Sequence, residues 1–307
     1  MRSTFLLASL CIFMCADIAF ATCIVSKYER GYGDRIQCSN VSLNAVFNQT
    51  SAQIVAITII HSKLINIPQR AFVRYAGSLS SLNIQRCKIM NIHQDAFGEM
   101  IYLKKLSLSN NNITEVKEAW FKDTAWLEHL DLSYNLIEKI EPMVFRNLKN
   151  LKLLDVRENR LTCLSSTAVE FMGALTKLRF SGNRLSLQCR GKLTLWLRDH
   201  GVDYKSDQSG KESWLDNLLW LCAIGDPNVA ASEVLMRECV ILNLFNQLRN
   251  SLISAESYPL TIPEECSRAR DSLTNCLASQ ARATSTLTNG NVIQSLLLNL
   301  QAAKSAV

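Results

Sequence analysis

Apolar side chains recur along this chain at a spacing that fits no single helix or strand. The stretch LEHLDLSYNLIEKIEPMVF, residues 127–145, places them at 127, 130, 132, 137 and 140, with an asparagine at 135. This spacing matches neither the helical period of 3.6 residues nor the strand period of 2. The pattern LxxLxLxxNxL occurs six times, with the asparagine position filled by Ser62, Cys87, Asn111, Asn135, Asn159 and Asn183, in one step of 25 residues and four of 24. So regular a period predicts a stack of repeated units.

Each position of the repeat has a physical role. Leu130 and Leu132 lie two apart, so they point to the same side of a short strand, and Asp131 points outward. The asparagine amide donates to and accepts from backbone groups that stacking would leave unpaired, whereas Ser62 and Cys87 are weaker substitutes. In the first four units a phenylalanine ten residues later fills the back: Phe72, Phe97, Phe121 and Phe145. A single unit has no neighbouring unit against which its apolar side chains can be buried, so several units must stack.

These motifs resemble the leucine-rich repeat family over about residues 23–204. The resemblance implies an α/β fold: a curved solenoid of about six 24-residue repeats, with a parallel β-sheet on its concave face and a role in binding macromolecules. The repeat length and the phenylalanine are similar to the extracellular branch of the family. We expect an N-terminal cap at 22–50, repeats at 51–187, a C-terminal cap at 188–210 and an α-helical, cysteine-containing tail at 211–307.

The N-terminus has the features of a secretory signal peptide. Arg2 precedes the apolar run FLLASLCIFM, and Ala19, Phe20 and Ala21 form a cleavage site of the A-x-A type. We therefore expect residues 1–21 to be removed and the mature protein to be soluble, secreted and extracellular. No later segment reaches 18 uninterrupted apolar residues, so no membrane span is expected.

The remaining nine cysteines are expected to form disulfides, the default in a secreted chain. The family resemblance implies a Cys23–Cys38 pair in the N-terminal cap and places Cys189 in the C-terminal cap, where its partner is either Cys163 or Cys222. Cys87 is expected to be a buried free thiol. Pairing Cys222 with Cys239 and Cys266 with Cys276 would leave no odd thiol in the tail.

The tail carries helical apolar patterns. Two helices are expected over SWLDNLLWLCAI and ASEVLMRECVILNLFNQLRNSLI, a third over 264–283 and a fourth from Asn291. On the second helix one face gathers Val234, Ile241, Phe245, Leu248 and Leu252. This tail either closes the end of the solenoid or assembles homo- or hetero-oligomers. The layout resembles the secreted leucine-rich-repeat immune proteins of insects, which implies another such chain or a complement-like protein as partner.

Binding is expected on outward strand positions of the concave face. The candidates are His61, Arg86, Asp131, Tyr134, Arg157 and Arg179. Tyr134, Arg157 and Arg179 centre a docking patch for an acidic protein face or an anionic glycan. Glycosylation sequons at Asn40, Asn48 and Asn112 agree with secretion.

Enzyme chemistry is not expected. The four histidines have no metal-ligand spacing, and no phosphate loop or nucleophile elbow occurs. No cofactor, metal or nucleic acid is expected for a secreted chain with a formal charge of only +6. The sequence favours a secreted protein-binding function in innate immune recognition or in scaffolding of complement-like partners. The alternative is an extracellular adhesion or matrix-organising protein without an immune role.

Overall fold

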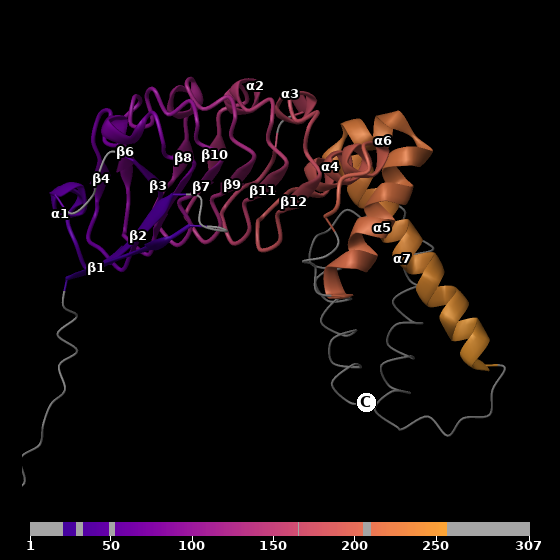
Figure 1. Ribbon diagram of the computed structural model, residues 1–307. Helices are drawn as coiled ribbons and strands as arrows, with labels where there is room; N and C mark the ends of the chain where they lie inside the picture. Colours follow the sequence, from indigo (N-terminus) through magenta and orange to yellow (C-terminus); the bar gives the residue numbers. More distant parts are fainter. Residues whose placement is uncertain (1–20, 29–32, 49–52, 165, 205–209, 257–307) are drawn as a thin grey trace, which may run out of the picture.

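The computed structural model describes residues 21–28, 33–48, 53–164, 166–204 and 210–256, which form a curved solenoid followed by helices (Figure 1). One sheet has the strand order β1-β2-β3-β5-β7-β9-β11-β12. Its strands are β1 (Thr22–Lys27), β2 (Asp34–Ser39), β3 (Ile54–Ile60), β5 (Ser81–Gln85), β7 (Lys105–Ser107), β9 (His129–Asp131), β11 (Leu153–Asp155) and β12 (Lys177–Arg179). All neighbours from β2 onward are parallel. The predicted α/β solenoid with a parallel sheet on its concave face is confirmed.

Each turn of the solenoid, here called a coil, contributes one strand in register with the next. Leu130 pairs with Leu106 on one side and with Leu154 on the other, so leucines stack on leucines inside the solenoid. The back of the coils holds short elements: β4 (Asn66–Ile67), β6 (Asn91–Ile92), β8 (Glu115–Val116), β10 (Lys139–Ile140), η2 (Val73–Tyr75), η3 (Glu118–Phe121), α2 (Val144–Asn147) and α3 (Ser166–Glu170). The four repeat phenylalanines lie within or between these elements and are at most 1% exposed.

The asparagines hold each coil to the one before it. Asn135 accepts at Oδ1 from the Ile113 N–H (3.2 Å) and donates from Nδ2 to the carbonyls of Leu108 and Leu132 (both 3.0 Å). Cys87 in the same place donates from its thiol to the Gln85 carbonyl (3.0 Å), and Ser62 accepts from the Val41 N–H (3.0 Å). Cys87 is the free cysteine of the described chain, and burial raises the pKa of its thiol.

Both ends of the solenoid are closed by disulfide-linked elements. At the N-terminus, β1 and β2 form an antiparallel hairpin bridged by Cys23–Cys38, followed by α1 (Leu43–Asn48). At the other end α4 (Leu187–Asp199) covers the last coil, and Cys163–Cys189 ties it to the loop after β11. Of the two partners left open for Cys189, the structure has Cys163.

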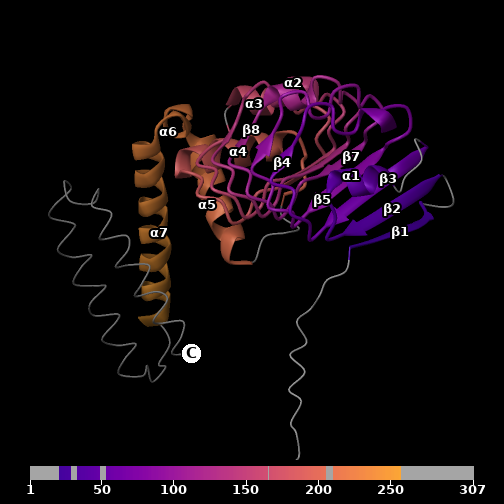
Figure 2. The ribbon, with the colours of Figure 1, turned by 90° about the vertical axis from the view of Figure 1, so that its left-hand side faces the viewer.

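Three further helices pack against α4 at the end of the solenoid opposite β1 (Figures 1 and 2). They are α5 (Gly210–Gly225), α6 (Pro227–Ala231) and α7 (Glu233–Glu256). Cys222–Cys239 joins α5 to α7. Glu233 accepts from the Gln188 N–H (2.7 Å) at the start of α4, and Arg190 donates to the buried Asp216 (2.5 Å) of α5. The described tail helices are thus anchored to the solenoid by buried polar contacts as well as by apolar packing.

The apolar stripe of the second tail helix could be either core or interface on the sequence alone. Its first residue, Val234, is 57% exposed, while Met236 and Val240 are buried against α4 and α5. The described start of α7 therefore packs through the side that carries Met236 and Val240, and the disulfide from Cys239 to Cys222 joins the helix to α5.

Several predictions fall outside the described residues: the signal peptide up to residue 20, the third and fourth tail helices, and Cys266 and Cys276. Over the residues that are described, no helix is both long and apolar enough to cross a membrane.

Candidate binding surface

The six predicted binding residues occupy two kinds of backbone position. Asp131 and Arg179 end their strands β9 and β12. His61, Arg86, Tyr134 and Arg157 lie beyond the strand ends, and the first three have φ of +50°, +53° and +54°. The prediction that these four lie on strands is wrong. At His61, Arg86 and Tyr134 the chain has left the sheet in a left-handed turn that aims the next residue, the repeat asparagine or its substitute, inward.

This turn recurs immediately before the asparagine position in every coil. Asn110 and Glu158 have φ of +56° and +51°, and Gly182 has +70°. Glycine and asparagine enter the left-handed region most readily, whereas other residues do so at some cost. Asn110 and Gly182 at equivalent positions were therefore a sequence signal for the turn. His61, Arg86 and Tyr134 form the rim of the concave face, and their exposed side chains border the strands.

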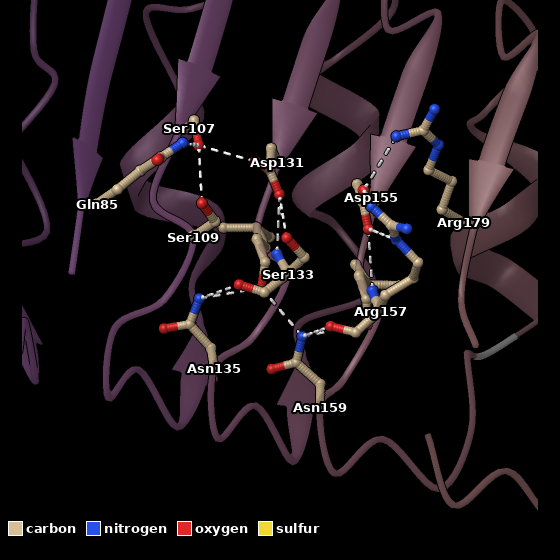
Figure 3. Close-up of polar contacts among 12 residues, drawn as sticks. Gln85, Ser107, Ser109, Asp131, Ser133, Asn135, Asp155, Arg157, Asn159 and Arg179 are labelled. Carbon is tan, nitrogen blue, oxygen red and sulfur yellow. Dashed lines mark hydrogen bonds and ion pairs between the residues drawn. The ribbon is translucent and has the colours of Figure 1, made fainter. Parts of the chain in front are cut away.

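A hydrogen-bonded polar row crosses the middle of the concave face (Figure 3). Gln85 donates to Ser107 Oγ (3.1 Å), and Ser107 donates to Asp131 Oδ2 (2.9 Å). Asp131 Oδ1 accepts from the hydroxyl and the N–H of Ser133 (2.6 and 3.0 Å). The carboxylate is thus fixed in orientation before any ligand arrives.

Two arginines converge on one carboxylate in the neighbouring coils (Figure 3). Arg157 Nη2 lies 2.7 Å from Asp155 Oδ2, Arg157 Nε also donates to that carboxylate (3.0 Å), and Arg179 Nη1 lies 3.5 Å from Oδ2. Asp155 is 3% exposed, although it is in register with the outward Asp131, because the arginines cover it. The group keeps one net positive charge, and the arginine side chains stay 26% and 29% exposed. Sequence reasoning identified both arginines but not the buried acid that positions them.

Tyr134 adjoins this cluster, which we call the arginine clamp: Asp155, Arg157 and Arg179. The Tyr134 N–H donates to the Arg157 carbonyl (2.9 Å), and its side chain is 50% exposed. The three residues predicted to centre a docking patch are thus brought together. Exposed tyrosine and arginine side chains are enriched among the residues that dominate protein interfaces.

Two of the four histidines, His61 and His129, lie on the sheet side of the solenoid but apart from each other. His61 follows β3 and His129 lies on β9, with β5 and β7 between these strands. Three strand spacings separate them by about 14 Å. Burial, reinforced by Lys105, lowers the pKa of His129, so its ring is neutral at pH 7. No group of three or more metal-ligating side chains occurs within the described ranges.

The glycosylation candidates Asn40, Asn48 and Asn112 are all exposed. Asn112 follows the repeat asparagine Asn111, at the same rim as Tyr134. Accessibility is a condition for modification at these positions, and the modification itself stays a prediction.

Comparison with known proteins identifies the repeat. The sequence model of the family described as leucine rich repeat matches residues 77–137 and 126–185. A search of curated proteins finds no match. Among solved structures, the chain is similar to one in "Crystal structure of TLR13-ssRNA13 complex", with 23% identity and a TM-score of 0.47 over 52% of this chain and 23% of that chain. It thus spans about a quarter of that chain, and so distant a likeness carries nothing about ligands. The matched repeats and the coiled parallel sheet show that residues 77–185 of the solenoid are built of leucine-rich repeats.

Proposed function

We propose that this chain is a secreted protein-binding leucine-rich-repeat protein that acts in innate immune recognition or in scaffolding of complement-like partners through its concave face. The observation that carries the proposal is the arginine clamp beside Tyr134, where fixed cationic side chains and an exposed aromatic ring share one open surface. The partner that fits is a protein presenting an acidic side chain to the arginines and apolar surface to the tyrosine.

The clamp suits recognition because little conformational freedom is lost on binding. Asp155 holds Arg157 through two guanidinium nitrogens and its backbone N–H, so that side chain is ordered beforehand. Immobilising a long side chain at an interface otherwise costs about 0.5–1.5 kcal/mol. Arg179 Nη1 lies 3.5 Å from the same carboxylate, and its side chain is 29% exposed.

Secretion belongs to the same proposal. The signal-like residues 1–21, three disulfides in the described chain and three exposed sequons support an extracellular address. Pairing with a second chain through the tail is a further part of it. It draws support from Leu221, Ile224, Leu235 and Leu242, which are 39–56% exposed on α5 and α7.

The competing proposal is an adhesion or matrix-organising role. The two are separated by where the protein occurs: a rise in body fluid after immune challenge supports recognition, whereas retention in extracellular matrix extracts supports adhesion. Partners cross-linked to the protein in its own fluid would be identified by mass spectrometry under non-reducing and reducing conditions.

The concave face is tested by Arg179→Gln, which removes one charge and leaves Asp155 paired with Arg157. We expect binding of the identified partner to weaken by about tenfold or more, as is common for an interface arginine. Arg160→Gln is the matched control, because Arg160 pairs only with the exposed Glu138 (3.6 Å). Equal binding by both variants would remove the concave face from the proposal.

A further inference from the structure

An exposed aromatic pair lies on the solenoid away from the arginine clamp. The residue just before the first leucine of successive repeats forms a row along the stack: Ser78, Tyr102, Trp126, Asn150 and Ala174. At its centre Tyr102 is 54% exposed and Trp126 60%, and Ile101 beside them is 51% exposed. Three large apolar side chains thus face solvent together, which distinguishes the site from a single surface residue.

The turns that carry the two rings are tied to each other. The Glu99 N–H donates to Asp123 Oδ2 (2.9 Å), and the Lys104 carbonyl accepts from the N–H groups of Glu128 and His129 (2.8 and 3.0 Å). These bonds join the segment before β7 to the segment before β9, on both sides of the aromatic positions. The backbones below the rings are therefore held one coil apart, which is about 5 Å where the strands begin.

The tryptophan turn is also fixed from the following coil. Asn150 donates from Nδ2 to the Ala125 carbonyl (2.9 Å), and the Leu127 N–H donates to Thr124 (3.0 Å). Thr124 is fully buried. The exposed ring of Trp126 thus stands on a rigid turn.

The polar groups beside the aromatic pair form an ion-paired group in which one carboxylate offsets one of two lysine charges. Two residues beyond the row, Glu128 lies between two lysines, with Lys152 Nζ at 2.7 Å and Lys104 Nζ at 4.0 Å. The Lys152 hydrogen bond lowers the pKa of Glu128, so the carboxylate is ionised at neutral pH. These three side chains offer donors and acceptors with only one net charge, which favours an uncharged, polar ligand over a polyanion.

Size decides between a protein and a smaller ligand. A tyrosine or tryptophan buries roughly 150–250 Å² when fully covered, so half-exposed rings present on the order of 100 Å² each. A standard protein interface needs about 800 Å² per partner. The patch is therefore matched to a ligand that covers two neighbouring rings.

We propose that this row binds a neutral linear oligosaccharide, with consecutive sugar rings over Tyr102 and Trp126. The C–H face of a pyranose supplies the apolar contact that an exposed aromatic ring lacks, and its edge hydroxyls reach Lys104, Glu128 and Lys152. Asn150 continues the row with an amide. A linear sugar and the solenoid both advance by one unit along a single axis, so rings spaced by one coil suit successive units. This sugar site goes beyond the concave-face proposal, and a negative result for either proposal leaves the other unchanged.

The test is a titration of the full mature protein with hexa-N-acetylchitohexaose and with laminarihexaose, followed by tryptophan fluorescence and calorimetry. We expect saturable binding of at least one of them, weakened about tenfold or more in Trp126→Ala and in Tyr102→Ala. Trp126→Phe should retain part of the affinity, because it keeps an aromatic face. Met90→Ala is the matched control: it removes a comparably exposed apolar side chain (55%) elsewhere on the solenoid and should leave sugar binding unchanged.

Several results would overturn the proposal. These are the absence of saturable binding to either neutral hexasaccharide, binding that the two alanine variants retain, and binding only of a sulfated heparin hexasaccharide. If neither neutral sugar bound and Trp126→Ala abolished association with a protein partner, the patch would be a protein interface instead. Because both rings are exposed, the variants should keep the wild-type circular dichroism and melting temperature, so folding does not confuse the result.

Discussion

Replacing Asn135 with alanine tests the bond network that holds the coils together. The side chain is 5% exposed and makes four hydrogen bonds, to the Ile113 N–H and to the carbonyls of Leu108, Leu132 and Ser133. The carbonyl groups of Leu108 and Leu132 also accept from Asn111 and Asn159, respectively, so these oxygens stay paired in the variant. The Ile113 N–H is left as the one buried group that loses its side-chain acceptor.

The expected loss of folding stability follows from that single unpaired N–H group. A buried donor without a partner costs about 1–3 kcal/mol. For a folded unit of this size, 1 kcal/mol lowers the melting temperature by roughly 2–4 °C. Asn135→Ala should therefore lower it by between about 2 and 12 °C.

Calorimetry and urea unfolding measure the change, and amide hydrogen exchange locates it. Exchange of the Ile113 amide should accelerate more than that of amides in distant coils. The control is Asn91→Ala, which removes an exposed hydrogen bond to Asn66 (2.9 Å) and should change stability by no more than about 0.5 kcal/mol. A loss in Asn135→Ala no larger than in the control would refute the assignment of the asparagine to the buried turn.

Three further changes follow from local geometry. Gly182→Ala should destabilise by about 1–2 kcal/mol, because φ is +70° and the new Cβ would meet a neighbouring carboxylate; Gly173→Ala, with open space around it, should be nearly neutral in thermal melts. The double change Cys163→Ser with Cys189→Ser opens a loop of 26 residues and should cost about 3.5 kcal/mol in denaturant unfolding on the chain-entropy estimate. The pKa of Glu128 is lowered in the folded state, so its stabilisation is present above the pKa of the unfolded carboxyl and is lost as pH falls through the folded value. Glu128→Gln should therefore flatten the acid side of the stability–pH curve, and an unchanged curve would contradict the ion pair.

The solenoid could be predicted from the sequence because equivalent positions of successive repeats contact one another and therefore carry the same kind of residue. Leu106, Leu130 and Leu154 pack against one another across coils, so each leucine is constrained by its copies one period away. The same reasoning predicted the buried phenylalanines. A constraint that recurs six times is visible in one sequence, even without a second chain for comparison.

The concave face was less predictable, because its contacts occur once and join unlike residues. Asp155 looks like any outward strand residue until Arg157 and Arg179 from two coils are placed over it. Similarly, the apolar Val234 is 57% exposed while Met236 and Val240 of the same helix are buried, and periodicity alone does not tell these faces apart. Periodicity gives the faces of an element, and pairwise contacts between elements decide which face is covered.

The arginine clamp has a consequence for how a concave-face partner would be recognised. Asp155 neutralises much of the field of Arg157 and Arg179, so their attraction at long range is weaker than two free arginines would give. At contact, the guanidinium groups are already oriented. Their attraction to a partner carboxylate is then screened less by salt than an attraction across open solvent. On the proposed function, Arg179→Gln should therefore raise the dissociation rate more than it lowers the association rate. Surface plasmon resonance at low and physiological salt separates these rates; a main effect on association that disappears with salt would mean that the partner responds to net charge and not to the clamp.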